Sequence, residues 1–146
     1  MRRYAFSALL YSLLGLGFGV FYREFTRGIG YEGATTLSVV HVHYLAMGML
    51  FFLIVLAMEK LFGFTGSKAS RWFFPVYSVG LNLTVAMLVV RGVAQALEAN
   101  LSSGADASIS GMAGLGHAAL AVGLVLFLTA LIRVLPKDPK ASPGGK

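Results

Sequence analysis

Three histidines, His41, His43 and His117, stand within long apolar stretches of this 146-residue sequence. An ionisable group near the centre of a membrane-spanning helix costs about 2.5–3.5 kcal/mol on insertion, so such a residue is considered first as a functional candidate. Neutral imidazole binds haem iron, zinc and copper. The sequence has no cysteine, which excludes thiolate metal sites, iron–sulfur clusters and covalently attached haem. The histidines therefore indicate a bound metal ion or a haem.

The composition requires that these histidines lie in membrane-spanning elements. Hydrophobic residues make up 57% of the chain and charged residues only 12%, which is too few to cover a water-facing surface. Gly15 and Gly19 on the first apolar segment predict a close helix contact. The segments are too long and too continuously apolar for barrel strands, so the sequence predicts an all-α, integral membrane four-helix transmembrane bundle. The predicted spans are residues 4–22, 36–58, 73–97 and 111–134.

The distribution of lysine and arginine predicts the orientation of the bundle. If the N-terminus is cytoplasmic, only Arg23 and Arg27 lie outside, Arg91 lies within a span, and the other basic residues lie inside. This bias predicts an N-in/C-in topology. We expect one transmembrane domain, residues 1–135, and a disordered basic cytoplasmic tail, residues 136–146. The first span is expected to be retained, because no A-x-A-like cleavage site follows it.

This topology places the polar residues of the spans at one depth. His41 and His43 lie in the first third of the second span, His117 lies in the first third of the fourth, and Arg91 lies near the outer end of the third. With a rise of 1.5 Å per residue, all four share about one level in the outer leaflet. Two histidines on facing helices can supply both axial ligands of a haem, and Arg91 is placed to pair with its propionates.

His41 and His43 are expected to face different spaces, because two positions along a helix correspond to a rotation of about 200°. His43 is favoured slightly as the ligand, since its stripe of the helix is more typical of a packed interior. Each residue also has a structural explanation. An intramembrane histidine can hydrogen-bond a neighbouring helix, and Arg91 can reach the headgroups or pair with Glu98.

Two other classes of protein remain open at this point. A His-x-His pair and a third histidine can bind zinc or copper in a metal-binding or transport protein. However, no intramembrane carboxylate joins them, and no broken helix or paired repeat is found. A non-catalytic structural or accessory subunit is the second alternative. Catalysis of the soluble type is not supported, because the sequence has no nucleophile–base pair and no Walker glycine loop.

Residues 35–48, Thr-Thr-Leu-Ser-Val-Val-His-Val-His-Tyr-Leu-Ala-Met-Gly, carry a resemblance to a known family. Together with residues 51–60, they resemble a four-span bacterial membrane family, domain of unknown function 2871, and the resemblance covers the whole chain. The H-x-H-x-x-x-x-G core is also similar to haem-binding helices of subunit I-like proteins related to haem–copper oxidases and of nitric-oxide-response membrane proteins. This similarity implies haem b, with His41 or His43 and His117 at the matching positions. The chain has too few helices and histidines for a haem–copper centre, so oxygen reduction is not implied.

Together these features predict a small cytochrome b-like, multi-pass protein of the bacterial plasma membrane that binds one haem b per chain. Ligation by two histidines favours electron transfer or redox sensing, whereas a single histidine leaves a position for a small gas ligand. The expected partners are the lipid bilayer and haem. The thin shell of four helices leaves room for a homodimer, and no nucleic-acid partner is expected, because topology accounts for the basic residues.

Overall fold

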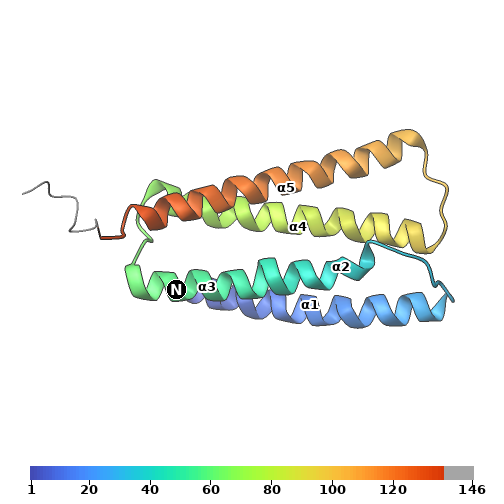
Figure 1. The fold of residues 1–146 in the computed structure, drawn as a ribbon, viewed down its shortest axis with the longest axis horizontal. Coiled ribbons are helices and arrows are strands. Elements are labelled where there is room, and N and C mark those ends of the chain that lie inside the picture. Colours follow the sequence, from blue (N-terminus) through green and yellow to red (C-terminus); the bar gives the residue numbers. More distant parts are fainter. Residues whose placement is uncertain (137–146) are drawn as a thin grey trace, which may run out of the picture.

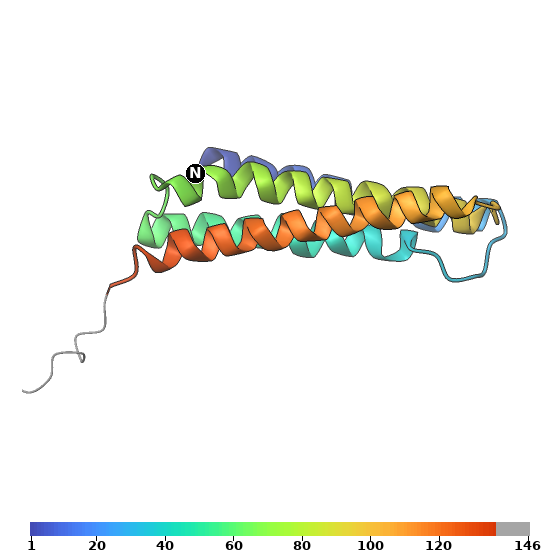
Figure 2. The same cartoon turned by 90° about the horizontal axis from the view of Figure 1, so that it is seen from above.

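The computed structural model describes residues 1–136, which form an up-and-down bundle of four long helices (Figures 1 and 2). The second of them, Leu37–Phe62, is one continuous helix in three parts and is called the second helix below. Its parts are α2, Leu37–Val42; the π-helical segment η1, His43–Leu50; and α3, Phe51–Phe62. The other three helices are α1, Arg2–Gly28; α4, Lys68–Ala96; and α5, Ser103–Ile132.

The four helices confirm the predicted all-α membrane bundle. Each is long and apolar enough to span a membrane, and residues 1–136 contain no strand. α4 and α5 begin before the predicted spans, and each has a serine N-cap whose side chain accepts a backbone hydrogen bond. α5 starts at Ser103 rather than at 111, since the Ser102 hydroxyl accepts a hydrogen bond from the Ala105 N–H at 3.2 Å. The second helix ends at Gly63, whose φ of 60° suits a residue without a side chain.

The described N-terminus and the end of α5 lie at the same end of the bundle (Figure 1). This is the arrangement that an even number of spans requires. Which end faces the cytoplasm stays a prediction. The predicted tail, apart from residue 136, lies outside the described residues.

Glycines allow α4 and α5 to pack closely. A Cβ atom on Gly116 of α5 would lie 2.5 Å from the Thr84 hydroxyl and 2.8 Å from the Thr84 backbone nitrogen. Gly80 of α4 faces the backbone of Leu120, and Gly123 of α5 faces Tyr77 in the same way. Helices in lipid gain stability mainly from such close packing, because the lipid tails provide no hydrophobic driving force between them.

A second glycine seam joins α1 to the second helix. A Cβ atom on Gly48 would lie 2.6 Å from Tyr11, and one on Gly15 would lie 2.8 Å from Leu45. A Cβ atom on Gly19 would lie 3.8 Å from His41. The predicted helix contact of Gly15 and Gly19 is thereby confirmed.

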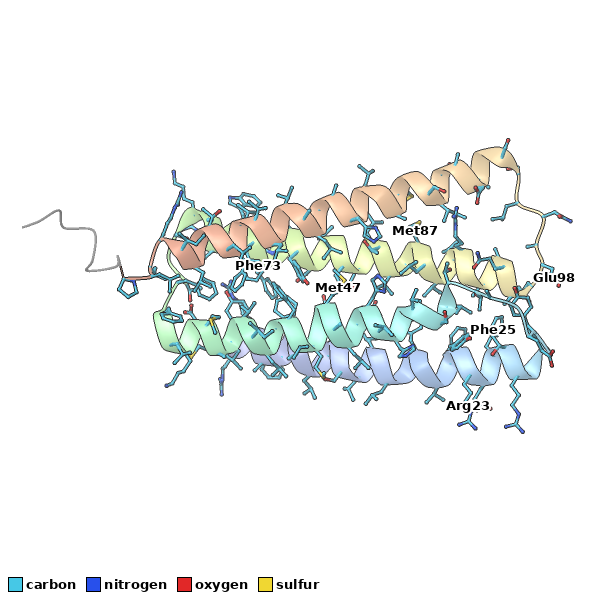
Figure 3. The ribbon with its side chains drawn as sticks, in the orientation of Figure 1. Arg23, Phe25, Met47, Phe73, Met87 and Glu98 are labelled. Carbon is cyan, nitrogen blue, oxygen red and sulfur yellow. The ribbon has the colours of Figure 1, made fainter. Side chains whose placement is uncertain are left out.

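Aromatic side chains fill the end of the bundle that carries the N-terminus. Phe73, labelled in Figure 3, lies among them and is fully buried. Phe51 stacks on Tyr77 with ring centroids 4.2 Å apart and meets Phe127 of α5 edge to face at 5.5 Å. These contacts fix the C-terminal half of the second helix against α4 and α5.

The α4–α5 seam gives a matched pair of variants. We expect Gly116→Ala to lower the stability of the bundle by about 1–3 kcal/mol, because the added methyl group meets the Thr84 backbone and forces the helices apart. Gly114→Ala is the control, since nothing lies within 4 Å of a Cβ at that position. Thermal unfolding in detergent, followed by circular dichroism, measures both. Equal midpoints for the two variants would contradict the seam.

Candidate functional site

His43 of η1 and His117 of α5 face each other across the edge between the second helix and α5. Their ring centroids are 6.5 Å apart, and the ring planes are nearly perpendicular, at 86°. His43 is half-buried and His117 is exposed along the side of the bundle. The structure thus brings together the two histidines that the sequence favours as a pair.

Each imidazole is oriented by its own helix. His43 Nδ1 lies 2.8 Å from the carbonyl oxygen of Val39, and His117 Nδ1 lies 2.8 Å from the carbonyl oxygen of Ala113. A carbonyl oxygen only accepts, so the proton of each neutral ring is on Nδ1. This leaves the Nε2 lone pair of both rings available. A histidine that binds a metal generally donates its other N–H to a backbone carbonyl or carboxylate, as both do here.

The spacing of the pair matches one shared metal ion. Two imidazoles on opposite sides of one metal ion, with each nitrogen about 2 Å from it, have ring centroids roughly 6 Å apart. With both protons on Nδ1, the two rings have no Nε2–H with which to hydrogen-bond each other. The pair is therefore better suited to binding a third group than to closing on itself.

His41 lies on a different side of the second helix, toward α1. Its Cβ atom lies close to Gly19 of α1, and its Nδ1 atom is buried without a hydrogen-bond partner. Within residues 1–136, no group of three or more histidine, cysteine, aspartate and glutamate side chains is placed to hold a metal ion. The structure does not bring His41 to the pair, as the 200° rotation between His41 and His43 requires.

Threonines attach the start of the second helix to α4. The Thr35 hydroxyl donates to the Gly92 carbonyl at 2.7 Å, and the Thr36 hydroxyl donates to the Leu88 carbonyl at 2.8 Å. The Thr36 N–H also donates to the Gln95 side chain at 2.8 Å. These bonds fix the helix two turns before His43.

The segment η1 begins at His43, and no sequence signal predicts it. π-helical segments in proteins are rare and concentrate at functional sites. On one side of η1, the Tyr44 hydroxyl donates to Asn82 of α4 at 3.2 Å, and the Asn82 amide donates to the Tyr11 hydroxyl at 2.9 Å. Asn82 therefore joins three helices, in agreement with a packing role.

An apolar groove of about 370 Å³ lies beside His117, between the second helix, α4 and α5. Met47, labelled in Figure 3, belongs to its wall. The hydroxyl of Tyr77 in this wall already donates to the Met47 carbonyl at 2.9 Å, so His117 is the main free polar group of the groove. Grooves of this size and character hold small apolar ligands. The lining residues are Ala46, Met47, Phe51, Tyr77, His117, Leu120, Ala121 and Leu124.

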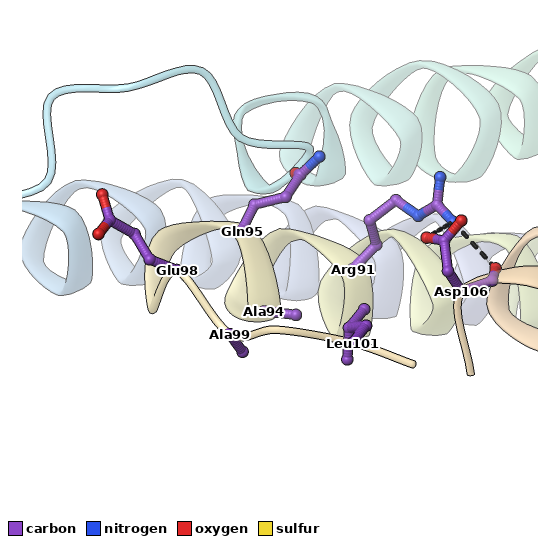
Figure 4. Close-up of a pocket in the computed structure, with 7 residues that line it drawn as sticks. All are labelled: Arg91, Ala94, Gln95, Glu98, Ala99, Leu101 and Asp106. Atoms are coloured by element: carbon purple, nitrogen blue, oxygen red, sulfur yellow. Dashed lines mark hydrogen bonds and ion pairs between the residues drawn. The ribbon is translucent and has the colours of Figure 1, made fainter. Parts of the chain in front are cut away.

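Arg91 lies toward the C-terminal end of α4 and binds α5. Its guanidinium donates to the Asp106 carboxylate at 2.7 Å (Figure 4). It also donates to the Ser110 hydroxyl at 2.7 Å, and the Arg91 side chain is 30% exposed. The alternative in which Arg91 pairs with Glu98 is wrong. α4 ends at Ala96, and Glu98 lies in the turn beyond it with a positive φ of 50°. The Arg91 guanidinium thus reaches Asp106 on the first turn of α5 instead.

Comparison with known families now places the chain. The family described as a protein of unknown function, DUF2871, matches residues 1–134. The chain belongs to this family. Comparison with curated proteins and with solved structures gives no match. Membership of this family assigns no role to any residue of the DUF2871 protein.

Residues 35–48 lie within the matched part of the chain and form the start of the second helix. This stretch contains the threonine attachment to α4, the histidine of the pair and most of η1. The same DUF2871 bundle is a multi-pass membrane protein by the length and apolarity of its helices. The similarity to helices of haem–copper oxidase relatives stays a prediction.

Proposed function

We propose that this protein is a small cytochrome b-like membrane protein in which His43 and His117 provide both axial ligands of one haem b per chain. The observation that carries the proposal is the spacing of two imidazoles whose Nδ1 atoms are both occupied by backbone carbonyls. Both Nε2 atoms remain available as ligands, and ring centroids 6.5 Å apart suit one iron between the two rings.

The donor set fits haem better than zinc or copper. Zinc takes about four protein or solvent ligands in a tetrahedral site, and the described residues place neither a third histidine nor a carboxylate with the pair. A porphyrin brings its own equatorial nitrogens, so two histidines complete the coordination of its iron. A two-histidine site with an adjoining apolar groove therefore favours haem over a structural zinc ion.

The groove and Arg91 support the same ligand. The groove offers apolar walls to a flat macrocycle, with Met47 and Phe51 on one side and Leu120 on the other. Arg91 reaches Ser110, which precedes His117 by two turns, or about 10 Å along α5. It is thus placed to hold an acidic group of the ligand near the outer end of the bundle.

Two axial histidines favour electron transfer or redox sensing over binding of a gas, because they leave no open position on the iron. Haem would supply a one-electron couple in this site, and the chain would bind and orient it and exclude water. We further propose a bacterial plasma membrane location with both ends in the cytoplasm. A homodimer stays a prediction.

Haem retention tests the axial pair directly. We expect the purified protein to be red, with a reduced-minus-oxidised α band and a positive pyridine haemochrome assay. His43→Ala and His117→Ala should each lose the bis-histidine spectrum, because each removes one Nε2 ligand. His41→Ala is the matched control and should keep the spectrum, since His41 lies toward α1. A colourless wild-type protein, or loss of haem in His41→Ala alone, would refute the assignment.

The environment of Arg91 predicts opposite effects for two substitutions. Arg91→Gln should speed the transfer of haem to a soluble acceptor protein roughly threefold to tenfold, because one charge-assisted bond in a partly exposed site is worth about 1 kcal/mol. Asp106→Asn should leave the rate unchanged or lower it, since the guanidinium loses its competing carboxylate. Transfer is measured by stopped-flow absorbance. An equal acceleration in both variants would show that Arg91 acts only by joining α4 to α5.

A further inference from the structure

One carbonyl of η1 is held by a side chain from another helix. In an α-helix, the Phe51 N–H would donate to the Met47 carbonyl, four residues earlier. Here it turns to the Ala46 and Gly48 carbonyls instead. The Met47 carbonyl thereby loses its α-helical donor, and the Tyr77 hydroxyl of α4 donates to it at 2.9 Å.

Close packing fixes the ring of Tyr77, and with it the position of the hydroxyl that donates this hydrogen bond. Tyr77 is 3% exposed and stacks on Phe51 with centroids 4.2 Å apart. Its backbone and Cβ atom lie against Gly123 of α5, where a Cβ would come within 2.7 Å. The hydroxyl therefore has a fixed position from which it holds the Met47 carbonyl.

We propose that Tyr77 is the positioning residue for His43, and that its hydroxyl stabilises η1 in the form that turns His43 toward His117. This inference rests on the proposed function for its meaning, although its geometry can be tested without haem. Tyr77 touches the wall of the groove, and it acts on the axial ligand through the backbone of η1 rather than by contact with the imidazole.

The second helix is attached to its neighbours on both sides of η1. The orientation of His43 therefore depends on the form that η1 takes. Before η1, Thr35 and Thr36 are hydrogen-bonded to α4, and after it Phe51 is packed between Tyr77 and Phe127. A π-helical segment needs roughly one residue more than an α-helix to complete the same number of turns. If η1 closes to an α-helix, the part before it must turn by about 100° relative to the part after it. If the part before η1 turns, the threonine attachment breaks and His43 leaves His117. If the part after η1 turns instead, Phe51 loses its packing on Tyr77 and Phe127.

The first test uses the absence of cysteine in the sequence. A His43→Cys/His117→Cys pair is treated with short homobifunctional thiol reagents in membranes, and the cross-linked fraction is followed by mass spectrometry. Addition of Tyr77→Phe should lower the rate of cross-linking at least roughly fivefold, because it leaves the Met47 carbonyl without its donor. Tyr11→Phe is the matched control, since it removes a hydroxyl of the same kind that bonds to Asn82 and not to η1.

A one-residue deletion supplies the rescue. Removal of Leu50, which is 51% exposed, lets a regular α-helix connect the same two attached ends. In that background, Tyr77→Phe should have no further effect on cross-linking. An undiminished rate in Tyr77→Phe with the full-length second helix would overturn the inference, and so would an equal loss in Tyr11→Phe. Failure of the cysteine pair to cross-link even with Tyr77 present would refute the facing geometry itself.

The second test uses the native histidines and the haem-loaded protein. In Tyr77→Phe, a fraction of the haem should change from the low-spin bis-histidine signal to a five-coordinate high-spin signal in electron paramagnetic resonance. The high-spin signal should match that of His43→Ala, because His117 keeps its own bond to Ala113. A colourless wild-type protein would refute the haem proposal while the cross-linking result still decides the role of Tyr77. A wholly low-spin Tyr77→Phe protein would refute that role and leave the haem proposal intact.

Discussion

The bond from an imidazole Nδ1 to a carbonyl one helical turn earlier is the interaction on which this site depends. It occurs twice, at His43 and His117, and each time it fixes both the proton and the direction of the ring. In hydrocarbon, a histidine without such a partner carries an unpaired polar atom, as His41 does at its buried Nδ1. His43 and His117 therefore differ from His41 in the hydrogen bonding of Nδ1 as well as in position.

α4 is the helix that places both members of the pair. It packs against α5 through a glycine seam that holds α5 close to its backbone. It also accepts the threonine bonds at the start of the second helix and donates the Tyr77 hydroxyl into η1. Lipid provides no hydrophobic force between helices. These contacts to the backbone therefore stabilise the association of the helices, as a hydrophobic core does in a water-soluble bundle.

Hydropathy predicted the four spans because backbone groups in lipid must be satisfied within each helix, which leaves few alternatives. Helix geometry also predicted that only one of His41 and His43 faces the interior. It did not decide which, since that depends on where α1 packs. Asp106, the partner of Arg91, was not predicted, and Glu98 was the only carboxylate considered, because the end of α4 and the start of α5 depend on local caps. No residue preference marks η1, which results from fitting a helix between two attachments.

The threonine attachment fixes one end of the second helix to α4. His43 lies roughly 11–12 Å along the helix axis from Thr35 and Thr36. The other end of the helix, at Phe62, lies roughly 40 Å away. Between them, Phe51 is packed against Tyr77 and Phe127, so the stretch that carries His43 is held on both sides. A displacement at Phe62 has to overcome this packing first, and a helix that then turned about the threonines would move His43 by only roughly three-tenths as much.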